Sequence, residues 1–424
     1  MSEQQKSDSL LGAYRVLDLT DEKGYFCGKI LGELGADVIK IEKPRGDPGR
    51  NIGPFYKDII DPEKSLYWMY FNANKRGITL DIETDDGQEI FKKLVKTADF
   101  VIESFHPGYM DSLGLGYDAL SKINPLIIMT SITPFGQTGP YKDFKSSDIV
   151  VWAMGSSMAY SGRADRPVRV GAPQGYIVGA LHAATGSMIA HYHRELTGEG
   201  QHVDVSAQQA CISSLAPAVE IWHLLRQIPP RDEIAGAFGR PEPWGIIKTR
   251  YIWPCKDGYV CMHLLGGANV GQAKASTELT KWAVSEGMAL ELKDYDWSKY
   301  DGSTISQSDR ERLENIIIPF LLTKTKEELY EAAREKGIFL LPSSNVKEVL
   351  ESPQLAARQF WVELEHPELD DTIAYPGAFL KLSECPCRVT RRAPLIGEHN
   401  DEIYEKELGF SKKKLATLKQ AKVI

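Results

Sequence analysis

Apolar runs typical of strands alternate with amphipathic helical segments along the first 133 residues, and this alternation constrains the fold more than any other feature. The apolar, β-branched runs lie at 14–20, 37–42, 77–84, 99–104 and 125–133. Helical patterns at 28–34 and 85–98 lie between them, and Gly35 ends the first helix. The last two runs are continuously apolar, as in buried parallel strands. The pattern therefore predicts a doubly wound α/β sheet.

Ligands of open α/β sheets bind where the strands reach their carboxyl ends. The segments expected at this edge are 20–24, 42–44, 104–107 and 133–139. Lys43, Arg45 and Arg50 follow the second predicted strand, and His106 follows the fourth. Because lysine and arginine bind phosphates through charge-assisted hydrogen bonds, these positions favour a phosphorylated ligand.

A further polar group, made of Asn72, Asn74, Lys75 and Arg76, lies immediately before the strand predicted at 77–84. Two amides and two cations on a strand-entry loop can hold phosphates. Taken alone, this segment fits a solvated loop better. Together with the clusters after the strands, it strengthens the hypothesis of a phosphorylated ligand.

The second half of the chain changes character after a helical, alanine-rich segment at 206–226. A stretch rich in Pro and Gly follows, and Asp257-Gly258 then joins two strand-like runs as a hairpin. A helix with Ser308 as its N-cap and a basic amphipathic helix in the tail are also expected. The predicted domains are a large domain at 1–205, a helical linker at 206–230, a small domain at 231–335, and a return linker with the rest of the large domain at 336–424.

Composition excludes several classes of protein. A formal net charge of -8 argues against a nucleic-acid surface and against an anionic membrane partner. No run of about 18 apolar residues occurs, so we expect no membrane span. The six cysteines form neither a CxxC pair nor a zinc-like spacing, so we expect reduced thiols in a cytoplasmic protein and no metal site. The motifs GxGxxG, GxxxxGK[ST] and GxSxG are missing, which argues against nucleotide-dependent redox chemistry and phosphoryl transfer.

Six sequence blocks extend from Arg15 to Phe410: RVLDLT…LGADVIKIEKPRGDPGR, NANKRGITLD, SFHPGYMDSLGLGY, SITPFGQTGPY, RELTGEGQHVDVS and APLIGEHNDEIYEKELGF. In this order they resemble the class III CoA-transferase family, which contains formyl-CoA transferase and carnitine CoA-transferase. The resemblance implies a Rossmann-like large domain built from both chain ends, a smaller α/β domain between them, and a dimer of two interlocked rings.

The resemblance also implies that acyl-CoA is a substrate, that no cofactor is bound covalently, and that CoA lies near the strand ends. The residues implied to contact CoA are Lys23 and Gly24 after the first strand, Lys43 on the 3′-phosphate side, Asn72, Asn74 and Lys75 along the nucleotide, Ser104, Phe105 and His106 as the next wall, and Phe135, Gly136 and Gln137 near the pantetheine. For Phe105 and Phe135, plain core packing is an equal alternative.

Tyr176 lies where the family has the aspartate that attacks the acyl-CoA thioester. The alignment rests on the glycines and alanines of GAPQGYIVGALHAATG at 171–186. The family's carboxylate passes through a mixed anhydride and an aspartyl-CoA thioester. A phenol with a pKa of about 10 is neutral at pH 7 and forms no acyl anhydride, so we assign this chain no catalytic residue. We expect Tyr176 to be at least partly buried.

Two other carboxylates are weaker candidates for the nucleophile. Asp165 is expected on a surface loop, and Asp148 matches a family position that is not the nucleophile. Related racemases combine the aspartate that Tyr176 replaces with a histidine at the position of Ser147, so both racemase groups are missing. The family's glycine-rich loop over the active site is replaced by GRPEPWG at 239–245.

The resemblance therefore predicts the non-catalytic subunit of a heteromeric enzyme that moves CoA from succinyl-CoA to a dicarboxylic acid such as (R)-benzylsuccinate. A paralogous class III chain would bring the aspartate, in a heterodimer or heterotetramer. Three alternatives stay open: a standalone transferase that uses another residue, a non-enzymatic CoA-binding or regulatory chain, and a relative with lyase or hydratase chemistry.

Overall fold

The computed structural model describes residues 9–163, 166–215, 218–226, 228, 250–267, 269–301 and 304–424. The chain divides into two compact units. The large unit comprises 1–155, 171–214 and 353–424, and the small unit comprises 156–170 and 215–352. The domain limits predicted at 205, 230 and 335 were based on changes in composition along the sequence. They stay predictions.

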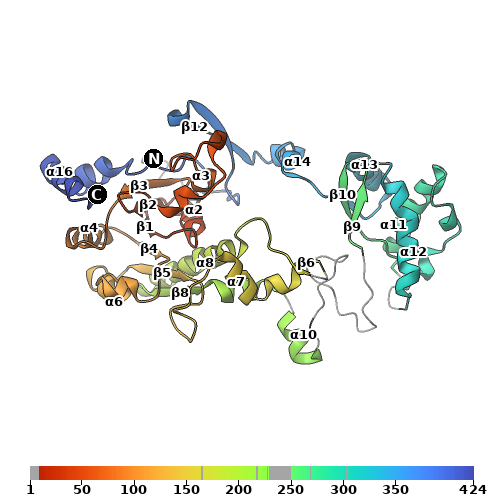
Figure 1. Cartoon of the computed structure of the whole chain (residues 1–424), viewed down its shortest axis with the longest axis horizontal. Helices are drawn as coiled ribbons and strands as arrows, with labels where there is room; N and C mark the ends of the chain where they lie inside the picture. Colours follow the sequence, from red (N-terminus) through yellow and green to blue (C-terminus); the bar gives the residue numbers. More distant parts are fainter. Residues whose placement is uncertain are drawn as a thin grey trace. The chain divides into compact units, whose positions relative to one another are not determined.

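A six-stranded parallel sheet forms the centre of the large unit, with the order β3-β2-β1-β4-β5-β8 (Figure 1). Its strands are β1 (Arg15–Leu19), β2 (Asp37–Glu42), β3 (Lys75–Thr79), β4 (Phe100–Glu103), β5 (Ile128–Thr133) and β8 (His202–Ser206). The strand order reverses between β1 and β4, as in doubly wound nucleotide-binding sheets. The predicted α/β class with a parallel sheet is confirmed.

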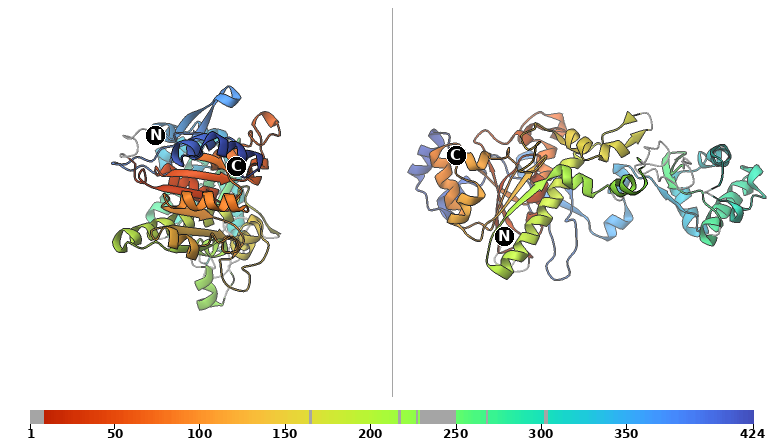
Figure 2. Two further views of the ribbon diagram at one scale, coloured as in Figure 1. Left: turned by 90° about the vertical axis from the view of Figure 1, so that its left-hand side faces the viewer. Right: turned by 90° about the horizontal axis from the view of Figure 1, so that it is seen from below.

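Helices cover both faces of this sheet (Figure 2). The residues of β1 alternate between the two faces, because side chains of a strand point to opposite sides. Leu17 and Leu19 pack in a core with α4 (Asp85–Val95), α6 (Tyr117–Ile123) and α16 (Lys412–Gln420). Val16 packs in a second core with α2 (Tyr25–Glu33) and α8 (Gln174–Thr197). The N-terminal strands and the C-terminal helix thus share one hydrophobic core.

Shorter elements complete the large unit. They are α3 (Leu66–Phe71), α5 (Tyr109–Ser112), α7 (Asp148–Met154), α9 (Ala207–Ser213), α15 (Pro353–Ala357), the antiparallel pair β12 (Trp361–His366) and β13 (Asp371–Pro376), the π-helix η7 (Asp401–Glu407), and the 3-10 helices η1 (Pro48–Asn51), η2 (Tyr56–Asp58) and η6 (Pro367–Leu369).

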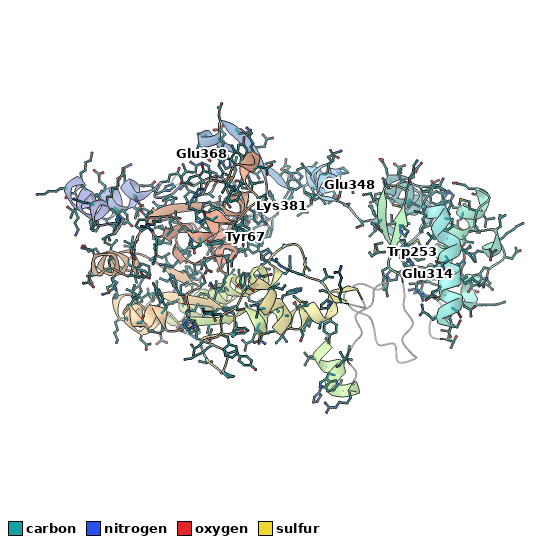
Figure 3. The ribbon with its side chains drawn as sticks, in the orientation of Figure 1. Tyr67, Trp253, Glu314, Glu348, Glu368 and Lys381 are labelled. Atoms are coloured by element: carbon teal, nitrogen blue, oxygen red, sulfur yellow. The ribbon has the colours of Figure 1, made fainter. Side chains whose placement is uncertain are left out.

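The small unit has its own sheet and its own core. Its elements are η3 (Ser157–Tyr160), β6 (Gly162–Arg163), β7 (Arg166–Pro167), α10 (Ala218–Leu225), β9 (Ile252–Cys255), β10 (Gly258–Met262), α11 (Val270–Ser285), η4 (Leu290–Leu292), η5 (Trp297–Lys299), α12 (Gln307–Leu321), α13 (Lys326–Lys336), β11 (Leu340–Pro342) and α14 (Val346–Leu350). The hairpin predicted at Asp257-Gly258 is confirmed as β9 and β10. Trp253, labelled in Figure 3, is buried in this core and donates its indole N–H to the carbonyl of Met262 at 2.9 Å.

Several predicted boundaries moved. The first helix begins at Tyr25, three residues earlier than expected, and β3 covers Lys75–Thr79 and not 77–84. The N-cap of α12 is Ser306 and not Ser308, because the Ser306 side chain accepts the hydrogen bond from the backbone N–H of Asp309, three residues later. None of the described helices is long and apolar enough to cross a bilayer.

Candidate functional site

A cavity of about 640 Å³ opens at the carboxyl ends of β1, β2 and β3 in the large unit. Its walls are built from Thr20 and Asp21 after β1, residues 43–48 after β2, and residues 80–82 after β3. Phe105 after β4, Tyr109 of α5 and Lys422 from the C-terminal end complete it. The sheet edge predicted to bind ligands is therefore the edge that is hollowed.

Four acids and three bases line the cavity, and among the described residues every acid except Asp81 forms an ion pair. Its buried acids Glu42 and Asp47 are paired with Arg50 and Lys40. Lys43 pairs with the exposed Glu83 at 2.9 Å. Arg45 and Lys422 are exposed, and their side chains form no ion pair or hydrogen bond with other described residues. Such a cavity can accept an anionic group, because mobile cations at its wall can bind phosphate or carboxylate.

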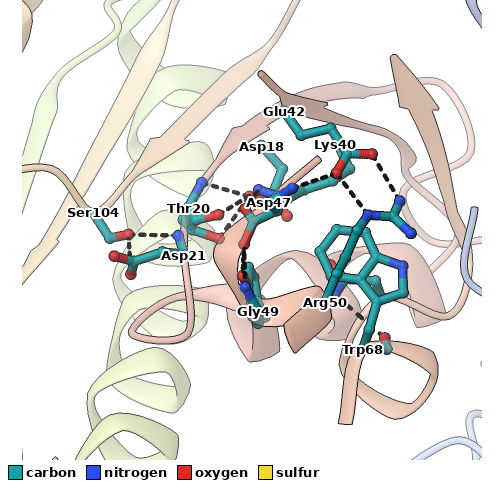
Figure 4. Close-up of polar contacts among 12 residues, drawn as sticks. Asp18, Thr20, Asp21, Lys40, Glu42, Asp47, Gly49, Arg50, Trp68 and Ser104 are labelled. Atoms are coloured by element: carbon teal, nitrogen blue, oxygen red, sulfur yellow. Dashed lines mark hydrogen bonds and ion pairs between the residues drawn. The ribbon is translucent and has the colours of Figure 1, made fainter. Parts of the chain in front are cut away.

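The loop that carries Lys43 and Arg45 is held from beneath by a buried polar network (Figure 4). Arg50 donates two hydrogen bonds of 2.7 Å to the two carboxylate oxygens of Glu42. Glu42 also accepts the backbone N–H of Asp47 at 2.8 Å. The Arg50 guanidinium lies 3.9 Å from the ring centre of Trp68 and bonds Glu63 at 2.6 Å. These contacts fix both ends of the loop.

Lys75 lies deeper in the same network. It is fully buried, and its ammonium group donates to the Asp18 carboxylate at 2.8 Å, to the Tyr25 carbonyl at 2.9 Å and to the Asn72 side chain at 2.9 Å. An ammonium has three protons, so all are used within the chain. Burial opposes ionisation of Asp18, yet Lys75 and Lys40 hold the pKa of that carboxyl below its usual value.

The strand-entry loop predicted for Asn72, Asn74, Lys75 and Arg76 is wrong, because Lys75 and Arg76 already belong to β3. Asn72 is buried at the end of α3, and Asn74 accepts the backbone N–H of Thr390 at 2.8 Å. The segment was expected at a ligand-facing loop, but its polar groups connect the sheet to the C-terminal part of the chain. CoA contacts from Asn72, Asn74 and Lys75 stay a prediction.

The remaining predicted contacts lie at the carboxyl edge. Lys23 forms an ion pair with Asp21, and Ser104 donates to Asp21 at 2.8 Å. Gly24 precedes α2, where a Cβ atom would lie 2.5 Å from Thr20 Cγ2, so the close approach requires glycine. Lys43 and Phe105 line the large cavity.

A second cavity of about 180 Å³ lies near β4, β5 and β8, and His106 and Gln137 line it. The backbone N–H of Gln137 is bonded to Asp204 at 3.0 Å. Gly136 has a φ of 92°, and Phe135 packs edge-on against Tyr141 and Phe144. Of the predicted residues, Lys43 and Phe105 thus line the larger cavity, His106 and Gln137 line the smaller one, and Asn72 and Lys75 lie in the buried network.

Tyr176 lies in the first turn of α8 and is 4% exposed, so the expected burial is confirmed. It packs with Val151, Ala207 and Cys211, and its backbone N–H donates to Asp148 at 3.1 Å. Burial, and then the nearby carboxylate of Glu22, raise the pKa of Tyr176 far above its usual value. The phenol is therefore neutral.

Tyr67 of α3, labelled in Figure 3, has the same acidic neighbours as Tyr176. Burial and Glu22 also raise the pKa of the Tyr67 phenol. Partial burial, with Asp21 as the next cause, raises the pKa of Glu22 itself. Two neutral phenols thus share one acidic neighbour at the turn between β1 and α2.

Sequence reasoning missed Glu22, Tyr109 and Lys422. Glu22 lies within the segment 20–24 that is expected at the ligand-binding edge, and Lys422 follows a helical pattern at a position where glycine is usual. Asp165 and the segment 239–245 lie outside the described residues. Among the described residues, no group of His, Cys, Asp or Glu could hold a metal ion.

Comparisons with known proteins agree with this geometry. The family described as CoA-transferase family III matches residues 11–400. Succinyl-CoA:(R)-benzylsuccinate CoA-transferase subunit BbsE from Thauera aromatica is 36% identical over 393 residues, 92% of each chain. Succinyl-CoA–D-citramalate CoA-transferase from Chloroflexus aurantiacus is 32% identical over 424 residues, 99% of each chain. The crystal structure of a CaiB/BaiF family protein from Brucella suis matches with a TM-score of 0.79 and 27% identity, over 93% of this chain and 98% of that chain.

Proposed function

Because this chain belongs to CoA-transferase family III, we propose that it is the non-catalytic subunit of a heteromeric CoA-transferase. The enzyme moves CoA from succinyl-CoA to a dicarboxylic acid such as (R)-benzylsuccinate. The relative from Thauera aromatica is named as a subunit of such an enzyme, and it matches nearly the whole chain.

The observation that carries this proposal is the buried, neutral Tyr176. Transfer through an enzyme carboxylate needs an ionised oxygen that attacks the thioester carbonyl. A phenol surrounded by Glu22, Asp21 and Asp148 loses its proton only at high pH, because each carboxylate opposes a second negative charge. An aspartate of a paralogous partner chain therefore supplies the nucleophile.

The proposed reaction has four acyl-transfer steps, and the partner's aspartate is regenerated at the end. Its carboxylate displaces the CoA thiolate from succinyl-CoA and forms a mixed anhydride with the succinyl group. The thiolate then attacks the aspartyl carbonyl and releases succinate, which leaves an aspartyl-CoA thioester. The acceptor carboxylate displaces the thiolate again, and the thiolate attacks the acceptor carbonyl, which releases the acyl-CoA product and restores the aspartate.

In this proposal the nucleotide half of CoA occupies the 640 Å³ cavity, near the cations Lys43 and Arg45. The large unit acts as a Rossmann-like domain made from both chain ends. It interlocks with the partner in a heterodimer or heterotetramer, so that each chain shapes the other's substrate pocket.

The test compares this chain alone, a paralogue with aspartate at the position of Tyr176, and the two together. Succinyl-CoA and benzylsuccinate are supplied, and the acyl-CoA product is separated by chromatography. We expect product from the mixture only, little change with Tyr176→Phe, and complete loss when the partner's aspartate becomes asparagine. Turnover by the purified chain alone would overturn the proposal.

One observation favours the alternative of a standalone transferase. Glu22 is a surface carboxylate next to the Tyr176 position, and its pKa is raised, first by partial desolvation on the side that faces the protein and then by the charge of Asp21. If Glu22 were the nucleophile, mass spectrometry after incubation with succinyl-CoA would find a CoA adduct on the peptide with Glu22, and Glu22→Gln would abolish it. The heteromer proposal places the adduct on the partner's peptide.

A further inference from the structure

The end of the chain forms a helix cap that usually requires glycine. The backbone N–H of Val423 bonds to the Leu418 carbonyl at 2.9 Å, and that of Lys422 bonds to the Lys419 carbonyl at 3.0 Å. These two bonds define the Schellman motif after α16, with Lys422 as its left-handed residue. Lys422 has a φ of 58°, a region that is unfavourable for a side chain with a Cβ atom. The cap alone therefore does not explain a lysine here.

The cap holds the chain end firmly beside the cavity. Val423 and Ile424 are buried in the main core, and the Val423 carbonyl accepts the backbone N–H of Asp81 at 2.7 Å. Asp81 lies shortly after β3 and itself lines the cavity. The backbone on either side of Lys422 is thus fixed, and Lys422 lines the cavity while Val423 and Ile424 are buried in the core.

The side chain of Lys422 forms no ion pair or hydrogen bond with the described residues. Of the four lysines of α16, Lys414 pairs with Asp86 at 3.0 Å and Lys419 with Asp401 at 3.7 Å. Lys422 and Arg45 line one cavity without such partners. Backbone strain that persists beside an unpaired charge indicates a ligand contact more than a structural role.

We propose that Lys422 is a phosphate-binding residue for the nucleotide half of CoA. The inference rests on the proposed function, because it takes the cavity as the CoA site. Lys43 and Arg45 approach the ligand from the loop after β2, and Lys422 approaches from the chain end. A nucleotide with three phosphate groups offers a partner to each cation.

The experiment measures binding of CoA and of dephospho-CoA by calorimetry, with the full chain alone and with its partner subunit. Lys422→Gly removes the charge and relieves the strained backbone. We expect its affinity for CoA to fall roughly tenfold while its Tm stays the same or rises. Weaker binding therefore cannot come from unfolding. Lys422→Arg should keep the affinity within about threefold.

Lys419→Ala is the matched control, since it removes the same charge from the same helix outside the cavity. It should leave the affinity for CoA unchanged. Loss of binding to CoA alone assigns Lys422 to the 3′-phosphate, and equal loss for both nucleotides assigns it to the pyrophosphate. Wild-type affinity in Lys422→Gly would overturn the inference alone. Failure of the wild-type protein to bind CoA would overturn the proposed function as well.

Discussion

At the scale of single residues, Lys75 shows how a side chain that suggests a ligand contact can have a structural role. It is fully buried, and its ammonium group donates its three hydrogen bonds to Asp18, Tyr25 and Asn72. Lys75→Met should lower the free energy of unfolding by about 3–5 kcal/mol, because it leaves the Asp18 charge buried without a partner. Urea unfolding measures the loss. The double variant Lys75→Met, Asp18→Asn should recover part of it, and equal loss in both variants would contradict the pairing.

The same pair predicts a dependence on pH. Lys75 and Lys40 outweigh burial and hold the pKa of Asp18 below its unfolded value. The ionised Asp18 carboxylate therefore stabilises the folded state above the unfolded pKa, and this stabilisation is lost as the pH falls through the lower folded pKa.

Glu103 at the end of β4 should give the opposite dependence. Burial raises its pKa to about 7, although Ser131 and the backbone N–H of Phe105 stabilise the carboxylate. The folded state then binds one more proton than the unfolded state between roughly pH 4.5 and 7, so stability falls as the pH rises through this window. Glu103→Gln should flatten the profile by about 3 kcal/mol in thermal or urea unfolding. An unchanged profile would show that Glu103 titrates normally.

At the scale of elements, the loop between β2 and α3 depends on one clamp, the bidentate pair of Arg50 and Glu42 (Figure 4). Arg50→Lys keeps the charge but loses the planar fork, which should cost about 2–4 kcal/mol and free residues 43–49. Hydrogen exchange should then rise in this loop, and the affinity for CoA should fall. Arg45→Lys is the control. Because Arg45 forms no such clamp, this substitution should change the affinity for CoA and leave stability and hydrogen exchange unchanged.

The order of these elements was predictable, because continuous apolar runs mark buried parallel strands locally in the sequence. The pair of Arg50 and Glu42 was predictable only in part. Lys43, Arg45 and Arg50 were marked as cations near the carboxyl edge, yet spacing alone does not say that Arg50 turns inward to Glu42 while Arg45 faces outward. For the same reason the buried role of Lys75 escaped prediction: identical residue types suit a solvated loop and a buried ion pair.

At the scale of the molecule, the family resemblance predicts a large domain built from both chain ends, but it does not predict which residues of the two ends meet. Leu415 and Leu418 of α16 share a core with Leu17 and Ile39, and Lys422 shares a cavity with Lys43. Periodicity reports which face of a helix is apolar, but it does not report which distant strand that face covers. One core of the large unit therefore contains residues from both ends of the described chain.

This arrangement predicts how the two units respond to truncation. Deletion of residues 412–424 removes Leu415, Leu418, Val423 and Ile424 from the core of the large unit, which should cost more than about 4 kcal/mol. The core of the small unit, built around Trp253 and Phe320, contains none of these residues. Calorimetry should therefore show the large-unit transition at lower temperature and the small-unit transition unmoved, with CoA binding abolished. Leu418→Ala should shift the same transition by a smaller amount, about 2–5 kcal/mol. A single transition that shifts as a whole would contradict this prediction, because it would mean that the two units unfold together although each has its own core.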